Sequence, residues 1–241
     1  MTHRKENIIL STLLNTIFPR RCPFCDSVIK PERDICEECE SDIEPLGDDV
    51  CLKCGRKLIV PTKNYCNTCE KNHFAFEQGK VCFEYEGKIK ESIHRFKYNN
   101  RREYARTYGR IAAERYGAWM RRKGIDYIVP VPMYRGKKLY RGYNQAELFA
   151  RSLSYYSGVP MLNCMKRTKN TRAQAELEQK DRKNNVLNAF KIDTDIVQYN
   201  QILVVDDIFT TGSTANETAR VLLGAGAKEV YVLCIASGSD F

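Results

Sequence analysis

ILVVDDIFTTGST, residues 202–214, carries the strongest indication of the fold in this chain. Four apolar residues predict a buried strand, two adjacent carboxylates stand at its end, and a turn rich in Thr, Gly and Ser then opens a helix. In open α/β sheets, ligands bind outside the carboxyl ends of the parallel strands. The sequence therefore predicts a ligand site where Asp206 and Asp207 emerge.

The turn after the two acids has the chemistry of an anion-binding loop. Backbone N–H groups near a helix N-terminus favour negative charge, and Gly212 lets the backbone approach a phosphate closely. Short hydroxyl donors are added by Thr210, Thr211, Ser213 and Thr214. Because carboxylates repel phosphate, we expect Asp206 and Asp207 to accept hydrogen bonds from sugar hydroxyls, with Mg²⁺ nearby. A sugar phosphate fits both halves of the stretch better than the alternative, a capped helix that follows a strand.

Eight of the eleven cysteines form C-x-x-C pairs whose spacing is typical of zinc ribbons. The pairs are Cys22/Cys25, Cys36/Cys39, Cys51/Cys54 and Cys66/Cys69. We expect neighbouring pairs to share an ion, which gives two Zn²⁺ sites; a cross-braced pairing is the second choice. Disulfides and redox pairs are the alternatives, and the absence of a secretory signal disfavours the first. Four thiolates leave no open position, so the predicted role of the metal is structural.

The strands and helices expected downstream alternate, which predicts a mostly parallel sheet with helices on both faces. We expect strands at 81–85, 126–131, 201–207 and 229–235, and helices at 88–98, 101–122, 144–153 and 213–224. Residues 135–141 are expected to form a cationic loop, and 165–181 a long loop or hood. The domains expected are residues 1–76, an N-terminal helix at 8–18 with a double zinc ribbon, and residues 77–241, the α/β domain.

Basic side chains are concentrated in the second part of the chain. Residues 1–80 carry 12 basic and 13 acidic side chains, whereas residues 81–241 carry 27 and 17. Such a surface favours anionic partners, including phosphorylated metabolites and nucleic acid, although a solvated helical face is the plainer interpretation. Because no window approaches the about 18 apolar residues of a membrane span, we expect a cytoplasmic protein without one.

Residues 204–214, VVDDIFTTGST, match the phosphoribosyl-pyrophosphate (PRPP) motif of the type I phosphoribosyltransferases. Together with the four C-x-x-C pairs and VPVPMYRGKKLYRGYNQAELFA at 129–150, they make the chain resemble the ComF family of competence proteins from end to end. The resemblance implies a type I phosphoribosyltransferase-like domain behind the ribbons. It also implies a Mg²⁺-dependent transferase linked to the uptake of single-stranded DNA in natural transformation.

The resemblance also implies roles for individual residues. Asp206 and Asp207 would contact the ribose hydroxyls of PRPP, and the residues from Thr210 to Thr214 would hold its 5′-phosphate. The turn at Val131 and Pro132 would receive the pyrophosphate. On grounds of charge, we place four cations near the leaving group, Arg135, Lys137, Lys138 and Arg141, with Arg95 and Lys97 as weaker candidates. The alternative from another functional class is a non-catalytic adaptor that binds single-stranded DNA or a competence helicase.

Overall fold

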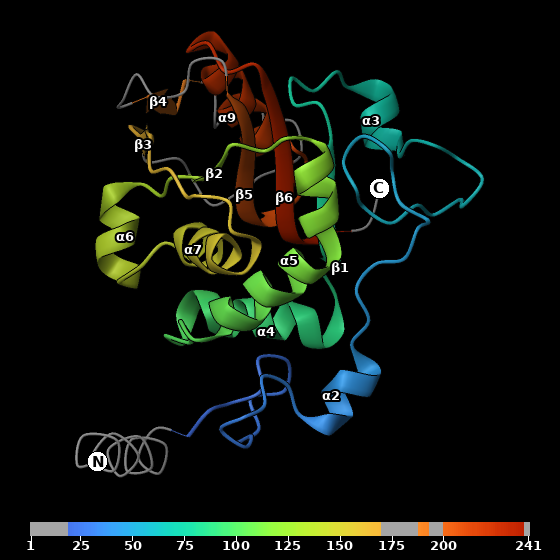
Figure 1. The fold of residues 1–241 in the computed structure, drawn as a ribbon, viewed down its shortest axis with the longest axis vertical. Helices are drawn as coiled ribbons and strands as arrows, with labels where there is room; N and C mark the ends of the chain where they lie inside the picture. The colour runs from blue at the N-terminus through green and yellow to red at the C-terminus, as the bar shows by residue number, and fades with distance from the viewer. Residues whose placement is uncertain (1–18, 170–187, 193–199, 239–241) are drawn as a thin grey trace. The chain divides into compact units, whose positions relative to one another are not determined.

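The computed structural model describes residues 19–169, 188–192 and 200–238 of the chain (Figure 1). The chain divides into two compact units, Met1–Glu44 and Pro45–Phe241. The helix expected at 8–18 lies outside the described residues. Across the described ranges, no helix combines the length and the apolar character that a bilayer crossing requires.

In the first unit, the described residues 19–44 form a small cysteine ribbon with little regular structure. An antiparallel bridge joins Arg21 to Val28, and the short helix α2, Glu37–Asp42, begins at Cys36. Arg33 forms ion pairs with Glu37 at 2.7 Å and with Glu40 at 2.5 Å, on the surface of that helix. Because the buried apolar surface is so small, a bound metal has to supply much of the folding free energy of this unit.

A four-stranded parallel sheet forms the centre of the second unit, in the order β1-β6-β5-β2. The strands are β1 Gly79–Glu84, β2 Tyr127–Pro130, β5 Gln201–Phe209 and β6 Glu229–Ser237. The pairing of β2 with β5 ends at Pro130 and Val205, so Asp206 is the next residue at the carboxyl edge. The predicted strand before the two acids is therefore confirmed as a central strand of the sheet.

Helices cover both faces of this sheet. They are α4 Gly87–Tyr98, α5 Tyr104–Arg122, α7 Gln145–Ser157 and α9 Ser213–Gly224. Helix α9 packs on the face of β5 that presents Ile202 and Val204, whereas Leu203 and Val205 are buried on the opposite face. Helix α7 contacts β2 and β5, and α5 contacts α7 and β1. The predicted α/β class, a parallel sheet with flanking helices after a ribbon segment, is confirmed.

One predicted loop is wrong, and a second is partly wrong. Residues 135–141 form the short helix α6, Arg135–Arg141, which ends where Gly142 adopts a left-handed conformation with φ of 81°. The expected loop at 165–181 begins with the strand β3, Met165–Arg167, which pairs antiparallel with β4, Phe190–Ile192. Residues 170–181 of that loop lie outside the described residues.

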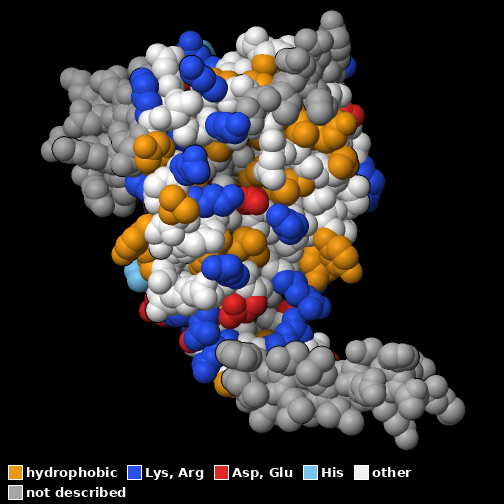
Figure 2. All heavy atoms as spheres, turned by 90° about the vertical axis from the view of Figure 1, so that its left-hand side faces the viewer, with side chains coloured by type: hydrophobic (Ala, Val, Ile, Leu, Met, Phe, Trp, Pro, Cys, Tyr) orange, Lys and Arg blue, Asp and Glu red, His pale blue; other side chains and the backbone are white. Residues whose placement is uncertain are grey.

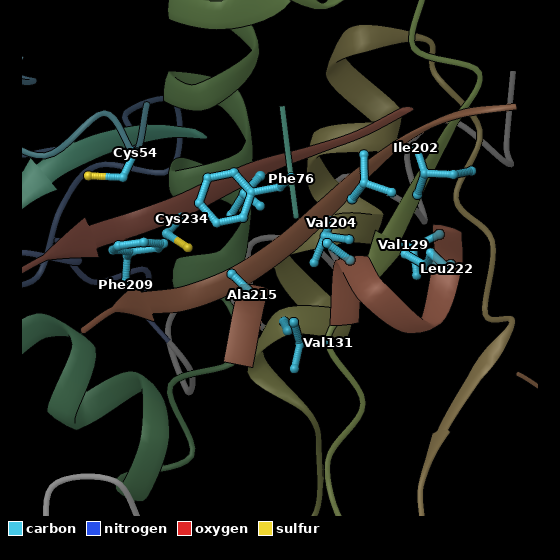
Figure 3. Close-up of a cluster of buried hydrophobic side chains, with 14 of the residues drawn as sticks. Cys54, Phe76, Val129, Val131, Ile202, Val204, Phe209, Ala215, Leu222 and Cys234 are labelled. Carbon is cyan, nitrogen blue, oxygen red and sulfur yellow. The ribbon is translucent and has the colours of Figure 1, made fainter. Parts of the chain in front are cut away.

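The second cysteine group belongs to the same compact unit as the sheet. Its segment, with the short helix α3, Asn67–Lys71, contributes Leu58 and Phe76 to the buried cluster that also holds Val204 and Leu222. Figure 3 shows Cys54 and Phe76 in this cluster with side chains of the sheet and of α9. The boundary expected between residues 76 and 77 follows sequence type and lies inside this unit, because packing divides the chain after Glu44.

Candidate functional site: two four-cysteine groups and a pocket at the sheet edge

The eight paired cysteines gather into two groups of four. Within each group, the Sγ atoms all lie within 4.8 Å of one another. The groups are Cys22, Cys25, Cys36, Cys39 and Cys51, Cys54, Cys66, Cys69. Zn–S bonds of about 2.3 Å in a tetrahedron place two sulfurs about 3.8 Å apart. Two Sγ–Sγ separations, 3.6 Å for Cys25–Cys36 and 3.7 Å for Cys54–Cys66, fit this value. The predicted pairing of neighbouring pairs is confirmed, and the two groups fit two structural zinc ions.

The first pair of each group lies in the same kind of turn. The amide of Cys22 donates to the carbonyl of Ser27 at 2.8 Å, and the amide of Cys51 donates to that of Arg56 at the same distance. A residue with positive φ makes each turn, Asp26 at 63° and Gly55 at 76°. Both turns therefore hold their two thiols at fixed positions before the chain leaves for the next pair.

The two acids at the end of β5 have different partners. Asp207 forms an ion pair with Lys97, in the last turn of α4, with 3.0 Å between Oδ1 and Nζ. Asp206 accepts a hydrogen bond through Oδ1 from the amide of Asp207 at 2.8 Å. Because successive side chains of a strand point to opposite faces, the carboxylates leave β5 on different sides.

Asp206 is the electrostatically strained member of the pair. Burial, and then repulsion from Asp207, raise the pKa of the Asp206 carboxyl to about 7. Lys97 and Arg167 lower this pKa without cancelling the effect. A carboxylate with a raised pKa at the carboxyl edge of a sheet is a candidate for ligand binding, since a ligand that hydrogen-bonds to the charged form would relieve the cost.

The loop between β5 and α9 has the geometry of an anion site. Gly212 caps α9 with φ of 78°, so no side chain occupies the cap position, and the first turn of α9 contains no acidic residue. Thr211 Oγ1 lies 2.8 Å from Ser213 Oγ and receives the Ser213 amide at 3.4 Å. The partial positive charge of the helix N-terminus is therefore directed at the loop.

A pocket joins the loop to Asp206. Its empty volume is about 280 Å³, open mouth included. Predicted site residues in its lining are Val131, Asp206, Thr210, Gly212 and Thr214. Thr211, Ser213 and Pro132 are neighbours of these residues in sequence and are not part of the lining. Asp207, the second predicted acid, is also outside the lining, so the pocket gathers only part of the predicted site.

Arg141, in contrast, is not part of the pocket lining. The Arg141 guanidinium lies 4.7 Å from the centre of the Tyr98 ring and donates to Gln145 at 2.8 Å. Among the described contacts, none joins it to Asp206 or Asp207. The residues that follow it are structural: Asn144 caps α7 and donates to the carbonyl of Val131 at 2.9 Å.

The other predicted cations lie on or near α6. Arg135, Lys137 and Lys138 are in the helix, and Lys138 forms an ion pair with Glu147 at 2.7 Å. Lys97, a weaker candidate in the sequence, is the cation that contacts an acid of the site. Arg167, which fits the pattern of the family in the hood segment without an assigned role, acts on Asp206 electrostatically.

Several curated proteins resemble the chain over most of its length, and a family model matches its start. Residues 13–70 match the family described as "Double zinc ribbon domain". Competence protein F of Haemophilus influenzae is 31% identical over 226 residues, 91% of this chain and 97% of that protein. DNA utilization protein YhgH of Escherichia coli K12 is 29% identical, covering 89% and 88%. Competence protein ComFC of Bacillus subtilis is 25% identical, covering 85% and 89%.

Among solved structures, a purine phosphoribosyltransferase from Pyrococcus horikoshii matches 54% of this chain and 73% of its own, with 19% identity and a TM-score of 0.35. A similarity of this size carries no functional conclusion. The match to the Haemophilus protein, at 31% identity over nearly the whole of both chains, does identify the family. With its two four-cysteine groups followed by a parallel α/β sheet, the chain belongs to the ComF family of competence proteins.

Proposed function

We propose that the pocket at the end of β5 binds PRPP with Mg²⁺ and that the protein is a phosphoribosyltransferase which serves natural transformation. The observation that carries this proposal is the pocket itself, in which Asp206 and the glycine-capped start of α9 face one space. Carboxylates suit the ribose hydroxyls, and a helix N-terminus without a side-chain cap suits the 5′-phosphate. The names of the curated relatives, which refer to competence and DNA utilization, support the link to DNA uptake.

The proposed reaction is a displacement at C1′ of PRPP with inversion. The acceptor forms a bond to C1′, the C1′–oxygen bond to pyrophosphate breaks, and the acceptor loses a proton to solvent. Carboxylate oxygens of Asp206 and Asp207 are the ligand type that Mg²⁺ prefers, and the ion would neutralise charge on the departing pyrophosphate. Lys97 pairs with Asp207 in the absence of ligand. Cations of α6, the helix that follows the turn after β2, would stabilise the leaving group.

Calorimetric titration with PRPP and Mg²⁺ tests the binding step. We expect wild-type protein to bind, and the double variant Asp206→Asn with Asp207→Asn to lose binding while its circular dichroism stays unchanged. The exposed adjacent acids Asp48 and Asp49 give a matched control, since Asp48→Asn with Asp49→Asn makes the same change in charge away from the pocket. Equal affinity in the two double variants would overturn the assignment. A screen of nucleobases for release of pyrophosphate then tests turnover.

A second candidate function is binding of single-stranded DNA as a non-catalytic adaptor. Three exposed tyrosines favour it: Tyr98, Tyr140 and Tyr155 are 58%, 93% and 82% exposed. Figure 2 shows Lys and Arg side chains, with hydrophobic ones between them, over one face of the molecule. Aromatic rings among cations are the usual platform for stacked bases. Binding to an oligonucleotide should weaken steeply as salt rises, and a flat response would exclude this function.

The zinc ribbons have a place in either function. As an adaptor, the protein would present them to a competence helicase or another transformation protein. The chain would act in the cytoplasm, where thiols stay reduced and available to zinc. Co-purification of a helicase with wild-type protein, lost in a variant without the first four cysteines, tests this partner.

A further inference from the structure

We propose that the second ribbon, residues 51–69, supports the loop at 210–212 between β5 and α9, here called the phosphate loop. Arg56 is the positioning residue that connects the two. The inference rests on the proposed function only for the identity of the ligand. It follows from contacts between the turn at 51–56 and the end of β5 with the loop at 210–212, all within the second compact unit.

Arg56 contacts the loop from the protein side. Its guanidinium donates through Nη2 to the carbonyl of Thr210 at 2.5 Å and lies 5.3 Å from the centre of the Phe209 ring. Phe209 is the last residue of β5, and Thr210 is the first residue of the loop. Because Arg56 is only 2% exposed, it has no surface to offer a ligand and acts through Thr210. A buried cation behind the loop also adds positive potential where an anion would bind.

The metal-binding turn fixes Arg56. The carbonyl of Arg56 accepts the amide of Cys51 at 2.8 Å, which closes the turn that holds the first two thiols. Gly55, in the left-handed region, packs so closely on Gly79 that an added Cβ would lie 2.7 Å from the Gly79 carbonyl oxygen. The amide of Gly79 in turn donates to the carbonyl of Lys53 at 2.6 Å. The turn is therefore clamped between the four sulfurs and the first residue of β1.

A second connection runs through the segment that follows the last cysteine pair. Phe74 and Phe76 pack against Phe209, with ring centres 6.4 Å and 6.2 Å from it. A Cβ at Gly212 would lie 2.8 Å from the Phe209 ring and 2.9 Å from the Phe74 ring, so both rings limit the space at the helix cap. The amide of Ala75 donates to Oδ1 of Asn216 in the first turn of α9 at 2.7 Å. Figure 3 shows Phe76 and Phe209 in one cluster.

These contacts predict that removing the Arg56 side chain increases hydrogen exchange in the loop more than in the rest of the second unit. We would compare hydrogen exchange of the peptide 206–218 with that of 145–157, in zinc-loaded protein without ligand. Arg56→Met keeps the aliphatic stem and removes the donor; Arg56→Lys keeps the charge but loses the planar fork, and preserves the fold if the first variant does not. Ser27→Ala, at the matching position of the first ribbon, is the control.

In Arg56→Met we expect exchange in 206–218 to rise at least tenfold with 145–157 unchanged, and the Kd for PRPP with Mg²⁺ to rise at least tenfold. Arg56→Lys should lie between this variant and wild type, and Ser27→Ala should match wild type. Unchanged exchange in both Arg56 variants overturns the inference, and so does an equal rise in both peptides, since that is general destabilisation. If wild type binds no PRPP while exchange still rises in 206–218 alone, the proposed function fails and this inference stands.

Discussion

The two ribbons have the same metal-binding turn and different surroundings. In both, the amide of the first cysteine donates to the carbonyl five residues later at 2.8 Å. That later residue is Ser27 in the first ribbon and Arg56 in the second. The first turn lies in the small unit 1–44, whereas the second is packed into the unit that contains the sheet. The same metal-binding turn can thus stabilise only its own small unit or support a loop that is distant in sequence.

The left-handed position of each turn shows the same difference. Asp26 occupies it in the first ribbon, where its carboxylate lies 3.8 Å from Arg21. Gly55 occupies it in the second, where backbone of Gly79 and Lys80 leaves no space for a side chain. Asp tolerates the left-handed region at a modest cost, so the glycine is required by close packing more than by φ. The second turn therefore packs directly against the start of β1.

The largest effect should come from removing the metal sites one at a time. Zinc binding supplies on the order of 10–16 kcal/mol per structural site, and this energy is available for folding. Cys51→Ser with Cys54→Ser should lower the thermal midpoint of the second unit by more than about 10 °C. Cys22→Ser with Cys25→Ser should lower it by at most about 2 °C, because the described core cluster of the sheet begins at Leu46.

Metal analysis should give two zinc ions in wild type and one in each of these variants. Circular dichroism follows the unfolding of the sheet. Equal midpoints in the two double variants would mean that both ribbons stabilise the sheet to the same extent. That result would contradict the proposed difference between them.

The next largest effect concerns one buried phenylalanine in each ribbon segment. Phe24 and Phe76 are both fully buried. Phe76→Ala should reduce the free energy of unfolding of the second unit by about 3–5 kcal/mol, because it leaves a cavity beside the sheet. Phe24→Ala should leave that free energy unchanged. Urea titration followed by fluorescence separates the units, since the single tryptophan, Trp119, lies in α5. A matching loss in Phe24→Ala would contradict the division.

Local patterns explain what the sequence could predict. The apolar run before Asp206 and the turn after it act over a few residues, and the helix expected at 213–224 has the bounds of α9. Cysteine spacing likewise favoured the grouping of neighbouring pairs over a cross-braced arrangement, and the structure has that grouping. Helix α6 was missed because it has seven residues and ends at a left-handed glycine, without apolar periodicity. The contact of Arg56 with Thr210 joins residues 154 positions apart, and no local pattern contains it.

A smaller effect distinguishes the pocket from the ribbons by its pH dependence. Below about pH 4, Asp206 is protonated in folded and unfolded chains alike. Between about pH 4 and 7 the unfolded chain ionises while the folded protein keeps the proton, since its pKa is raised to about 7. The free energy of unfolding therefore falls as pH rises through this window, and the cost is complete above pH 7.

Asp206→Asn, which can still accept the amide of Asp207, removes this cost. At pH 8 we expect it to stabilise the second unit by about 2 kcal/mol, a value reduced for partial solvent exposure, and at pH 4 by nearly nothing. Urea titrations at the two values of pH measure the difference. A variant equally stable relative to wild type at both would show that Asp206 titrates normally.

The smallest effect tests a single hydrogen bond between the second ribbon segment and α9. Asn216→Ala removes the acceptor of the Ala75 amide and should cost about 1 kcal/mol, because that amide is left partly buried without its partner. Asn72→Ala is the matched control: Asn72 donates at 2.7 Å to the carbonyl of Thr68 within its own segment. If the link matters to the loop, Asn216→Ala also raises hydrogen exchange in 206–218, whereas Asn72→Ala does not. A loss of stability in Asn216→Ala without that local rise would mean that this hydrogen bond does not hold the phosphate loop. Arg56 and the phenylalanines alone would then support the loop.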